Sequence, residues 1–214
     1  MTEDEIQALR TAAATPVRAN HADIASVADD LAAAFSADPV FQWFLRDDDR
    51  RSTARQTLFQ MLLTATALPD GVVTRPVTGG AAQIWLPSEA LGDGPFWQEL
   101  RSLPALLGIT GFSRFPRMLA MRKAMDAHHP MDRPHDYLWF IGARPEAQGY
   151  GVGSRLLASG LEQVDARRRH AFLESSNIAN VPLYRRFGFE VMEAYNFGPG
   201  SPSIWPMWRE ARAK

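Results

Sequence analysis

A short glycine-rich segment at residues 148–153 limits the folds available to this chain more than any other feature. It reads Gln-Gly-Tyr-Gly-Val-Gly and separates an apolar run at residues 137–143 from an amphipathic run at residues 154–169. The apolar run predicts a buried strand, and the leucines of the amphipathic run recur at the spacing of a helix. A strand that passes through a tight turn into a helix is typical of α/β domains.

The rest of the chain supplies further elements of both kinds. Apolar periodicity and turn residues predict a hairpin at residues 72–77 and 81–86, strands at 171–174, 189–195 and 204–208, and a helix at 179–187. This alternation predicts an α/β fold in which helices cover a sheet. We expect one domain over residues 1–214, with a loose leader at 1–18 and a helical insertion at 88–134. Within the insertion, helical patterns occur around residues 96–107 and 114–127.

The glycine-rich segment also indicates an anion site. Backbone N–H groups at the start of a helix can converge on an anion, and a Cβ atom would hold the anion away from them. The segment lacks the Gly-Lys-Ser/Thr ending of a nucleoside-triphosphate loop and the spacing of a Gly-x-Gly-x-x-Gly fingerprint. That fingerprint normally opens its domain, which further disfavours a dinucleotide fold, and a plain tight turn is the remaining alternative.

Charge and composition argue against several classes of partner. The 23 basic and 24 acidic side chains leave a formal net charge of −1, so no positive field gathers nucleic acid or anionic lipid. The acidic start lacks the pattern of a secretory signal, and no apolar run approaches the roughly 20 residues that span a bilayer. Cysteine is absent, which fits a reducing compartment, and we expect a cytoplasmic protein.

Two motifs resemble the GNAT superfamily of acyl-CoA-dependent N-acyltransferases. The strand at residues 138–143, followed by a Gln-x-x-Gly-x-Gly pattern that begins at Gln148, is similar to that family's central strand and pyrophosphate loop. Residues 177–189 are similar to its second signature, in which Tyr184 precedes a Gly-Phe pair. The order and spacing of the two motifs match the family as well.

A narrower resemblance extends over most of the chain from about residue 20. Residues 31–44, the Ile-Trp-Leu-Pro sequence at 84–87, residues 172–176 and the Pro-Met-Trp sequence at 206–208 are similar to puromycin N-acetyltransferase and its bacterial relatives. This resemblance implies a small-molecule amine as acceptor, by analogy a toxic or antibiotic-like compound. Residues 90–131 carry no motif of that group, so the identity of the acceptor is left open.

The family resemblance implies a mixed, mostly antiparallel sheet with a splayed central strand pair and flanking helices. It also implies acetyl-CoA as the cofactor and direct attack of the amine on the thioester. The residues implied to bind the cofactor lie on the central strand, in the loop and in the second signature: Phe140, Ile141, Gly142, Ala143, Gln148, Gly149, Tyr150, Gly151, Val152, Gly153, Ser154, Asn177, Asn180 and Tyr184. For Asn177 and Asn180, capping of the following helix is an equal alternative.

Two side chains are candidates for acid and base catalysis. Tyr184 matches the family's general acid, since a phenol with a pKa of about 10 stays protonated at neutral pH and can protonate a departing thiolate. Glu174 follows a predicted strand beside the expected reaction centre and is the best-placed general base. The alternatives are a tyrosine that only packs in the core and a carboxylate that only forms a salt bridge in the cleft wall.

Four aromatic residues are candidates for the lining of an acceptor pocket. Trp43, Trp85, Trp97 and Phe112 are expected to line the pocket, because such sites are aromatic with few polar groups, although each could belong to the core. We expect no metal, because the histidines at residues 128–135 lie in a proline-rich connector. The alternative functions are acetylation of a protein amine and non-catalytic binding of acyl-CoA or a small ligand, and a homodimer is left open.

Overall fold

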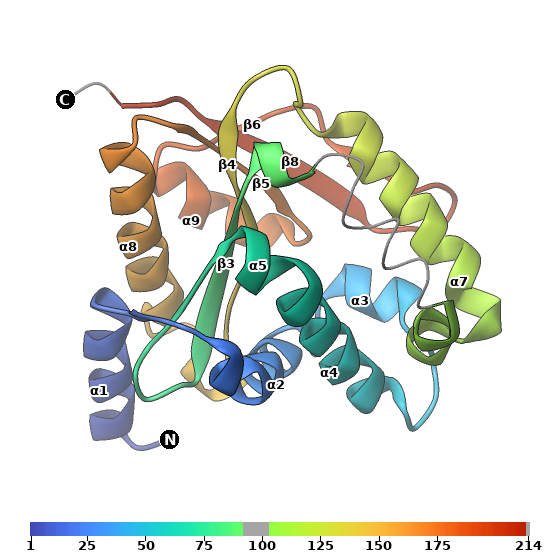
Figure 1. Cartoon of the computed structure of the whole chain (residues 1–214), viewed down its shortest axis with the longest axis horizontal. Coiled ribbons are helices and arrows are strands. Elements are labelled where there is room, and N and C mark those ends of the chain that lie inside the picture. The colour runs from blue at the N-terminus through green and yellow to red at the C-terminus, as the bar shows by residue number, and fades with distance from the viewer. Residues whose placement is uncertain (92–102, 213–214) are drawn as a thin grey trace.

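A computed structural model describes residues 1–91 and 103–212, whose strands form one twisted central sheet (Figure 1). The spatial order is β1 (Val17–Arg18), β2 (Val72–Arg75), β3 (Ala81–Pro87), β4 (His135–Ala143), β5 (His170–Ser175), β8 (Ser203–Arg209) and β6 (Glu190–Val191). A short strand, β7 (Tyr195–Asn196), also pairs with β8. Neighbouring strands are antiparallel except for β4 and β5, which are parallel. The predicted mixed, mostly antiparallel sheet is confirmed.

Helices cover both faces of this sheet. They are α1 (Glu3–Ala14), α2 (Ile24–Ala34), α3 (Pro39–Phe44), α4 (Arg51–Leu62), α5 (Leu68–Asp70), α7 (Leu103–His128), α8 (Val152–Ala166) and α9 (Val181–Arg186). One buried cluster joins α2, α3, α4 and α7 to the sheet, and separate clusters join α8 to α9 and to α1. Within the described ranges, none of the helices has the length and hydrophobicity needed to cross a membrane.

Alternation along β3 explains how one strand serves both layers. Ala82 and Ile84 pack with α2 and α4, whereas Ala81 packs with α1 and α8, and Trp85 packs with α8 and α9. Successive side chains of a strand point to opposite faces, so a run of apolar residues is buried on both sides. β3 is therefore covered by helices on both faces of the sheet.

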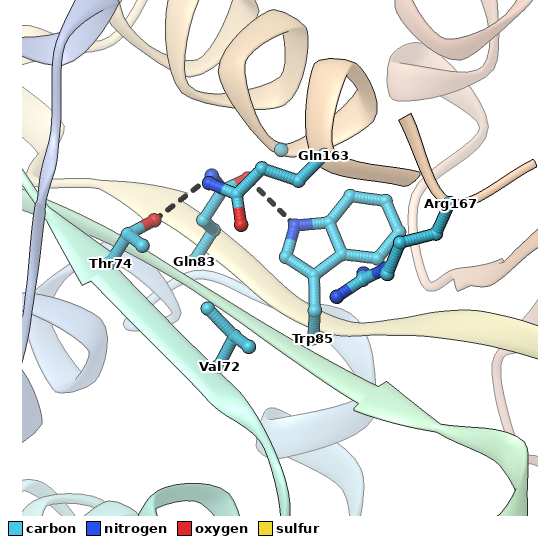
Figure 2. A pocket seen from close by; sticks show the side chains of 7 residues that line it. Val72, Thr74, Gln83, Trp85, Gln163 and Arg167 are labelled. Atoms are coloured by element: carbon cyan, nitrogen blue, oxygen red, sulfur yellow. Dashed lines mark hydrogen bonds between the residues drawn. The ribbon is translucent and has the colours of Figure 1, made fainter. Parts of the chain in front are cut away.

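Helix α8 lies unusually close to β3 at Gly160. A Cβ atom at this position would lie 2.8 Å from Oε1 of Gln83 and closer still to the indole nitrogen of Trp85. Beneath the helix, the Trp85 indole donates to Gln83 at 3.0 Å, and the Gln83 amide donates to Thr74 at 3.0 Å (Figure 2). This buried chain of hydrogen bonds satisfies the polar groups on the α8 side of the sheet.

The expectation of a loose leader at residues 1–18 is wrong, because most of this segment forms α1. Thr2 caps the helix: its hydroxyl accepts from the Glu5 N–H at 3.2 Å, and the Glu5 carboxylate accepts from the Thr2 N–H at 2.7 Å. Leu9 and Ala13 are buried against α8. A Thr-x-x-Glu capping box was readable in the sequence, and the burial against α8 was not.

The predicted helical insertion at residues 88–134 contains α7 and a short 3-10 turn at Ser88–Leu91. Gly111 interrupts α7 with a φ of 68° and a ψ of 165°, so the element consists of two helical parts that meet at a bend. The helix expected at residues 96–107 falls partly outside the described residues. The helix expected at residues 114–127 matches the second part of α7.

We expect Gly160→Ala to destabilise the protein by about 1–3 kcal/mol, because the added methyl group overpacks the contact with Trp85. Alanine has the higher helix propensity, so propensity alone predicts the opposite sign. Gly108→Ala in α7 is the matched control, since no atom lies within 4 Å of the added Cβ. Urea unfolding of both variants measures the difference, and a Gly160→Ala protein as stable as the control would contradict the packing argument.

Candidate active site

The glycine-rich loop presents an uncapped helix start. The chain leaves β4 at Ala143, and Gly149 and Gly151 adopt φ values of 82° and 81° before α8 begins. Gly151 occupies the N-cap position and has no side chain to accept from the first turn, so the N–H groups there are free to bind an anion. Gln148 fixes the loop by donating its amide to the Ala143 carbonyl at 2.9 Å.

The central strand pair separates next to this loop. β4 and β5 pair from His135 opposite His170 to Leu138 opposite Leu173, and no further. Beyond this point β4 pairs with β3 alone, while β5 continues against β8. The β4 segment that ends at Ala143 therefore has one edge free for hydrogen bonds in the middle of the sheet. The predicted splayed pair is confirmed.

A large cavity of about 1180 Å³ lies at this separation. Nearly all residues expected to bind the cofactor line it: Phe140, Ile141, Gly142, Ala143, Gln148, Gly149, Gly151, Val152, Gly153, Ser154, Asn177, Asn180 and Tyr184. Tyr150 is the exception, because its side chain is exposed at 52 % and it is not part of the lining. Residues from the two sequence motifs thus meet around one space.

Glu174 lies in the wall of this cavity and is held by two tyrosines. The Tyr137 hydroxyl donates to its carboxylate at 2.8 Å, and the Tyr195 hydroxyl donates to the other oxygen. Burial raises the pKa of Glu174 to about 7, although both hydroxyl hydrogen bonds oppose the shift. A carboxyl group with this pKa exchanges protons readily at neutral pH. The alternative of a salt-bridged Glu174 is not what the structure shows, since its two hydrogen-bond donors are phenols.

Tyr184 is buried on α9 and also faces the cavity. Burial, assisted by the nearby Asp38 carboxylate, raises the pKa of Tyr184 to about 12, so the phenol keeps its proton throughout the physiological range. Its ring packs edge-on against Phe189 at 6.2 Å between centroids. A role in core packing and a role as general acid are therefore compatible at Tyr184.

Asn177 and Asn180 differ in what they do locally. The Asn177 side chain accepts from the Ala179 N–H at 2.9 Å, which makes it the N-cap of the turn before α9. Asn180 has no such capping bond, so its amide is available to a ligand in the cavity. The capping alternative therefore holds for Asn177 and fails for Asn180.

The expected aromatic acceptor residues are not where the sequence suggested. Trp85 is buried beneath α8, Phe112 is 84 % exposed, and neither lines the cavity. Trp43 packs in a tilted arrangement against Phe197, with 5.6 Å between the ring centroids, and lies outside the lining. Trp97 falls outside the described residues. The rings lie away from the cavity because the orientation of each strand and helix decides which face a ring covers, and composition does not reveal that orientation.

Methionines and phenylalanines form the apolar wall instead. They come mainly from α3, α4 and α7 and include Phe41, Phe44, Met61, Met118, Met121 and Met125. Methionine is flexible and polarisable, so a wall of this kind adapts to ligands of different shapes. Sequence reasoning missed it, although the methionine spacing in residues 118–125 was a usable signal.

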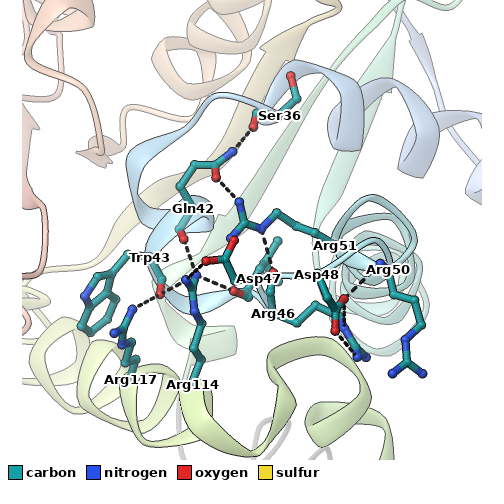
Figure 3. Close-up of polar contacts among 11 residues, drawn as sticks. Ser36, Gln42, Trp43, Arg46, Asp47, Asp48, Arg50, Arg51, Arg114 and Arg117 are labelled. Carbon is teal, nitrogen blue, oxygen red and sulfur yellow. Dashed lines mark hydrogen bonds and ion pairs between the residues drawn. The ribbon is translucent and has the colours of Figure 1, made fainter.

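Arginines hold α7 in place at the side of the cavity (Figure 3). The Arg114 guanidinium donates to the carbonyls of Gln42 at 2.7 Å and Leu45 at 2.9 Å, and pairs with Asp47 at 2.7 Å. These carbonyls lie at the end of α3, where the helix leaves them unpaired. The ion pair and hydrogen bonds therefore tie the methionine-bearing helix to the α3 end of the site.

Residues 75–189 match the Acetyltransferase (GNAT) family. A mycothiol acetyltransferase from Pseudarthrobacter chlorophenolicus is 30% identical over 181 residues, covering 76% of this chain and 53% of that protein. Another, from Paenarthrobacter aurescens, is 30% identical over 145 residues, covering 59% of this chain and 45% of that protein. The chain spans about half the length of these relatives.

Solved structures give the same fold. A protein from Corynebacterium glutamicum, described as histone acetyltransferase HPA2 and related acetyltransferase, has a TM-score of 0.70 at 25% identity, covering 93% of this chain and 97% of that one. A polyamine N-acetyltransferase from Drosophila melanogaster has a TM-score of 0.60 at 12% identity, with coverage of 91% and 98%, and shows likeness of fold alone.

The two relatives named above are mycothiol acetyltransferases and not puromycin N-acetyltransferases, so the narrower resemblance stays a prediction. The family resemblance has firmer support, because the match covers more than half of the 214 residues and includes both motifs. This chain belongs to the GNAT family of acetyltransferases.

Proposed function

We propose that this protein transfers the acetyl group of acetyl-CoA to the amine of a small molecule. The observation that carries the proposal is one cavity that brings together a free strand edge, an uncapped phosphate loop, the Glu174 carboxylate and the Tyr184 phenol. Family membership supports the donor. The names of the mycothiol acetyltransferase relatives support a small-molecule acceptor.

The residues present fit coenzyme A. No atom lies within 4 Å of the position that a Cβ would take at Gly149 or Gly153, so the loop has room for a pyrophosphate. The free edge of β4 beyond Leu138 offers backbone donors and acceptors in line, which suits the amide groups of the pantetheine arm. Both features lie in the wall of the same cavity.

The two titratable groups have complementary tasks. Bound acetyl-CoA supplies the thioester that the acceptor nitrogen attacks. Glu174, with a pKa of about 7, accepts the proton that the amine must lose, and its two tyrosine donors fix the carboxylate in position. Tyr184 retains its proton at neutral pH and donates it to the sulfur as the carbon–sulfur bond breaks.

The cavity wall favours an acceptor with an apolar body. Methionines of α7 and phenylalanines of α3 line the same space, while Glu174 supplies a carboxyl group that can interact with an amine. Because Arg114 ties α7 to the end of α3 at the side of this space, we infer a small molecule and not a protein chain as the acceptor. Puromycin, an amine with an aromatic body, is a candidate acceptor on the narrower resemblance.

Calorimetric titration with acetyl-CoA, followed by a thiol-release assay, tests this function directly. We expect saturable binding and thiol release that depends on an added amine, with arylalkylamines and puromycin faster than hydrophilic amines such as agmatine or an amino sugar. Free thiol released without any amine is the baseline. Absence of acetyl-CoA binding at millimolar concentration would overturn the proposal. Binding without amine-dependent thiol release would also overturn it and would indicate a protein that binds acyl-CoA without turnover.

Tyr184→Phe should lower kcat by about a hundredfold, because phenylalanine keeps the ring in the core but cannot donate a proton. The affinity for acetyl-CoA, measured by calorimetry, should change little. Thermal melting checks that the variant is folded. A variant that keeps the full kcat across the pH range would show that Tyr184 is not the general acid.

The pH dependence of kcat/KM should report Glu174. Since a base acts in its ionised form, kcat/KM should rise as the pH increases through about 7, the pKa of this carboxyl group. In Glu174→Gln this rising limb should disappear and the rate should fall by about a hundredfold, leaving only the titration of the amine at higher pH. Glu162→Gln, on the exposed side of α8, is the control and should keep the wild-type profile. An unchanged limb in Glu174→Gln would assign it to another group.

A further inference from the structure

An arginine on the N-terminal helix lies beside the glycine-rich loop. Leu9 and Ala13 of α1 are buried with Val152 of α8, which fixes the helix against the start of α8. On this helix, Arg10 places its Nε 4.0 Å from the position that a Cβ would take at Gly151. The segment matched to the GNAT family begins at residue 75, so α1 lies outside the matched part.

The side chain of Arg10 is half-buried, and one nitrogen of its guanidinium is buried without a partner. Its Nε is buried without a hydrogen-bond partner, and its Nη1 donates to Gln7 at 3.3 Å. The Nε atoms of Arg75 and Arg169 are also buried without hydrogen bonds, but these two arginines pair with Asp23 and Asp136. In the described residues, Arg10 has no carboxylate partner of this kind.

The positive groups at Arg10 and at the start of α8 favour the binding of an anion between them. The start of α8 carries the positive end of the helix dipole, and Gly151 provides no side chain to balance it. A second positive group beside it, with a buried and unpaired N–H, costs free energy when no negative group lies between them. A phosphate at the loop would satisfy the free N–H groups of α8 and the guanidinium together.

We propose that Arg10 binds the pyrophosphate of coenzyme A, so that α1 completes the phosphate site of this protein. The inference rests on the proposed use of acetyl-CoA. It assigns to the N-terminal helix a role in cofactor binding, in which Arg10 adds a guanidinium N–H to the backbone N–H groups of residues 149–153. The family motif alone provides only the backbone part of this site.

Calorimetry with coenzyme A tests the proposal through affinity and not through turnover. Arg10→Gln should weaken binding by about ten- to a hundredfold, the usual loss for a hydrogen bond to a charged group. Dephospho-coenzyme A, which keeps the pyrophosphate, should show the same loss, whereas binding of pantetheine, which has no phosphate, should be the same in both proteins. Arg50→Gln makes the same change of charge at an exposed arginine before α4 and should bind as the wild type does.

Thermal melting separates a ligand role from a structural one. If Arg10 binds the cofactor, the melting temperature of Arg10→Gln without ligand should be no lower than that of the wild type. Added coenzyme A should raise the melting temperature of the variant less than that of the wild type. A variant that melts early but keeps its affinity would overturn the proposal and give Arg10 a structural role. Unchanged affinity, or a loss that disappears with dephospho-coenzyme A, would also overturn it. Failure of the wild type to bind coenzyme A would instead contradict the proposed function.

Discussion

Beyond Leu138, the backbone of β4 finds hydrogen-bond partners in β3 alone, because β5 turns away to pair with β8. A sheet interrupted in its middle leaves backbone donors and acceptors that a continuous sheet would pair with the next strand. Such groups favour a ligand with an amide backbone of its own. The large cavity, the orientation of the glycine-rich loop and the position of Glu174 at the diverging end of β5 all follow from this separation.

The two faces of the sheet support the site in different ways. On one face, α8 approaches β3 so closely at Gly160 that a Cβ atom there would overlap the side chains of Gln83 and Trp85, and this contact places the helix that follows the glycine-rich loop directly on the sheet. Helix α1 packs on the same side and brings a cation to the loop. On the other face, α3, α4 and α7 form the apolar wall, held by the arginine contacts at the end of α3. The face that carries α8 is thus closely packed against the sheet, and the other face is lined by adaptable methionines.

The chemistry of the site depends on burial as much as on residue identity. Burial moves the pKa of Glu174 upward to about 7 and that of Tyr184 to about 12, so the proposed base exchanges its proton near neutral pH while the proposed acid keeps its proton. Tyr137 and Tyr195 moderate the first shift by donating to the carboxylate. Asp38 adds to the second shift and at the same time caps α3 by accepting from the Val40 N–H.

The sequence by itself determined most elements of the fold and the location of the glycine-rich loop. Strand and helix periodicities depend on local spacing, and a phosphate loop requires glycines at adjacent positions, so both are visible along the chain. The capping box at Thr2 was visible too, although its helix was not predicted.

Only the tertiary structure decided which side chains meet. The donors to Glu174 come from strands 37 and 21 residues away, and Trp85 faces α8 and not the cavity because of its place in the alternation of β3. Contacts between distant segments depend on strand register and helix packing, which no local pattern specifies.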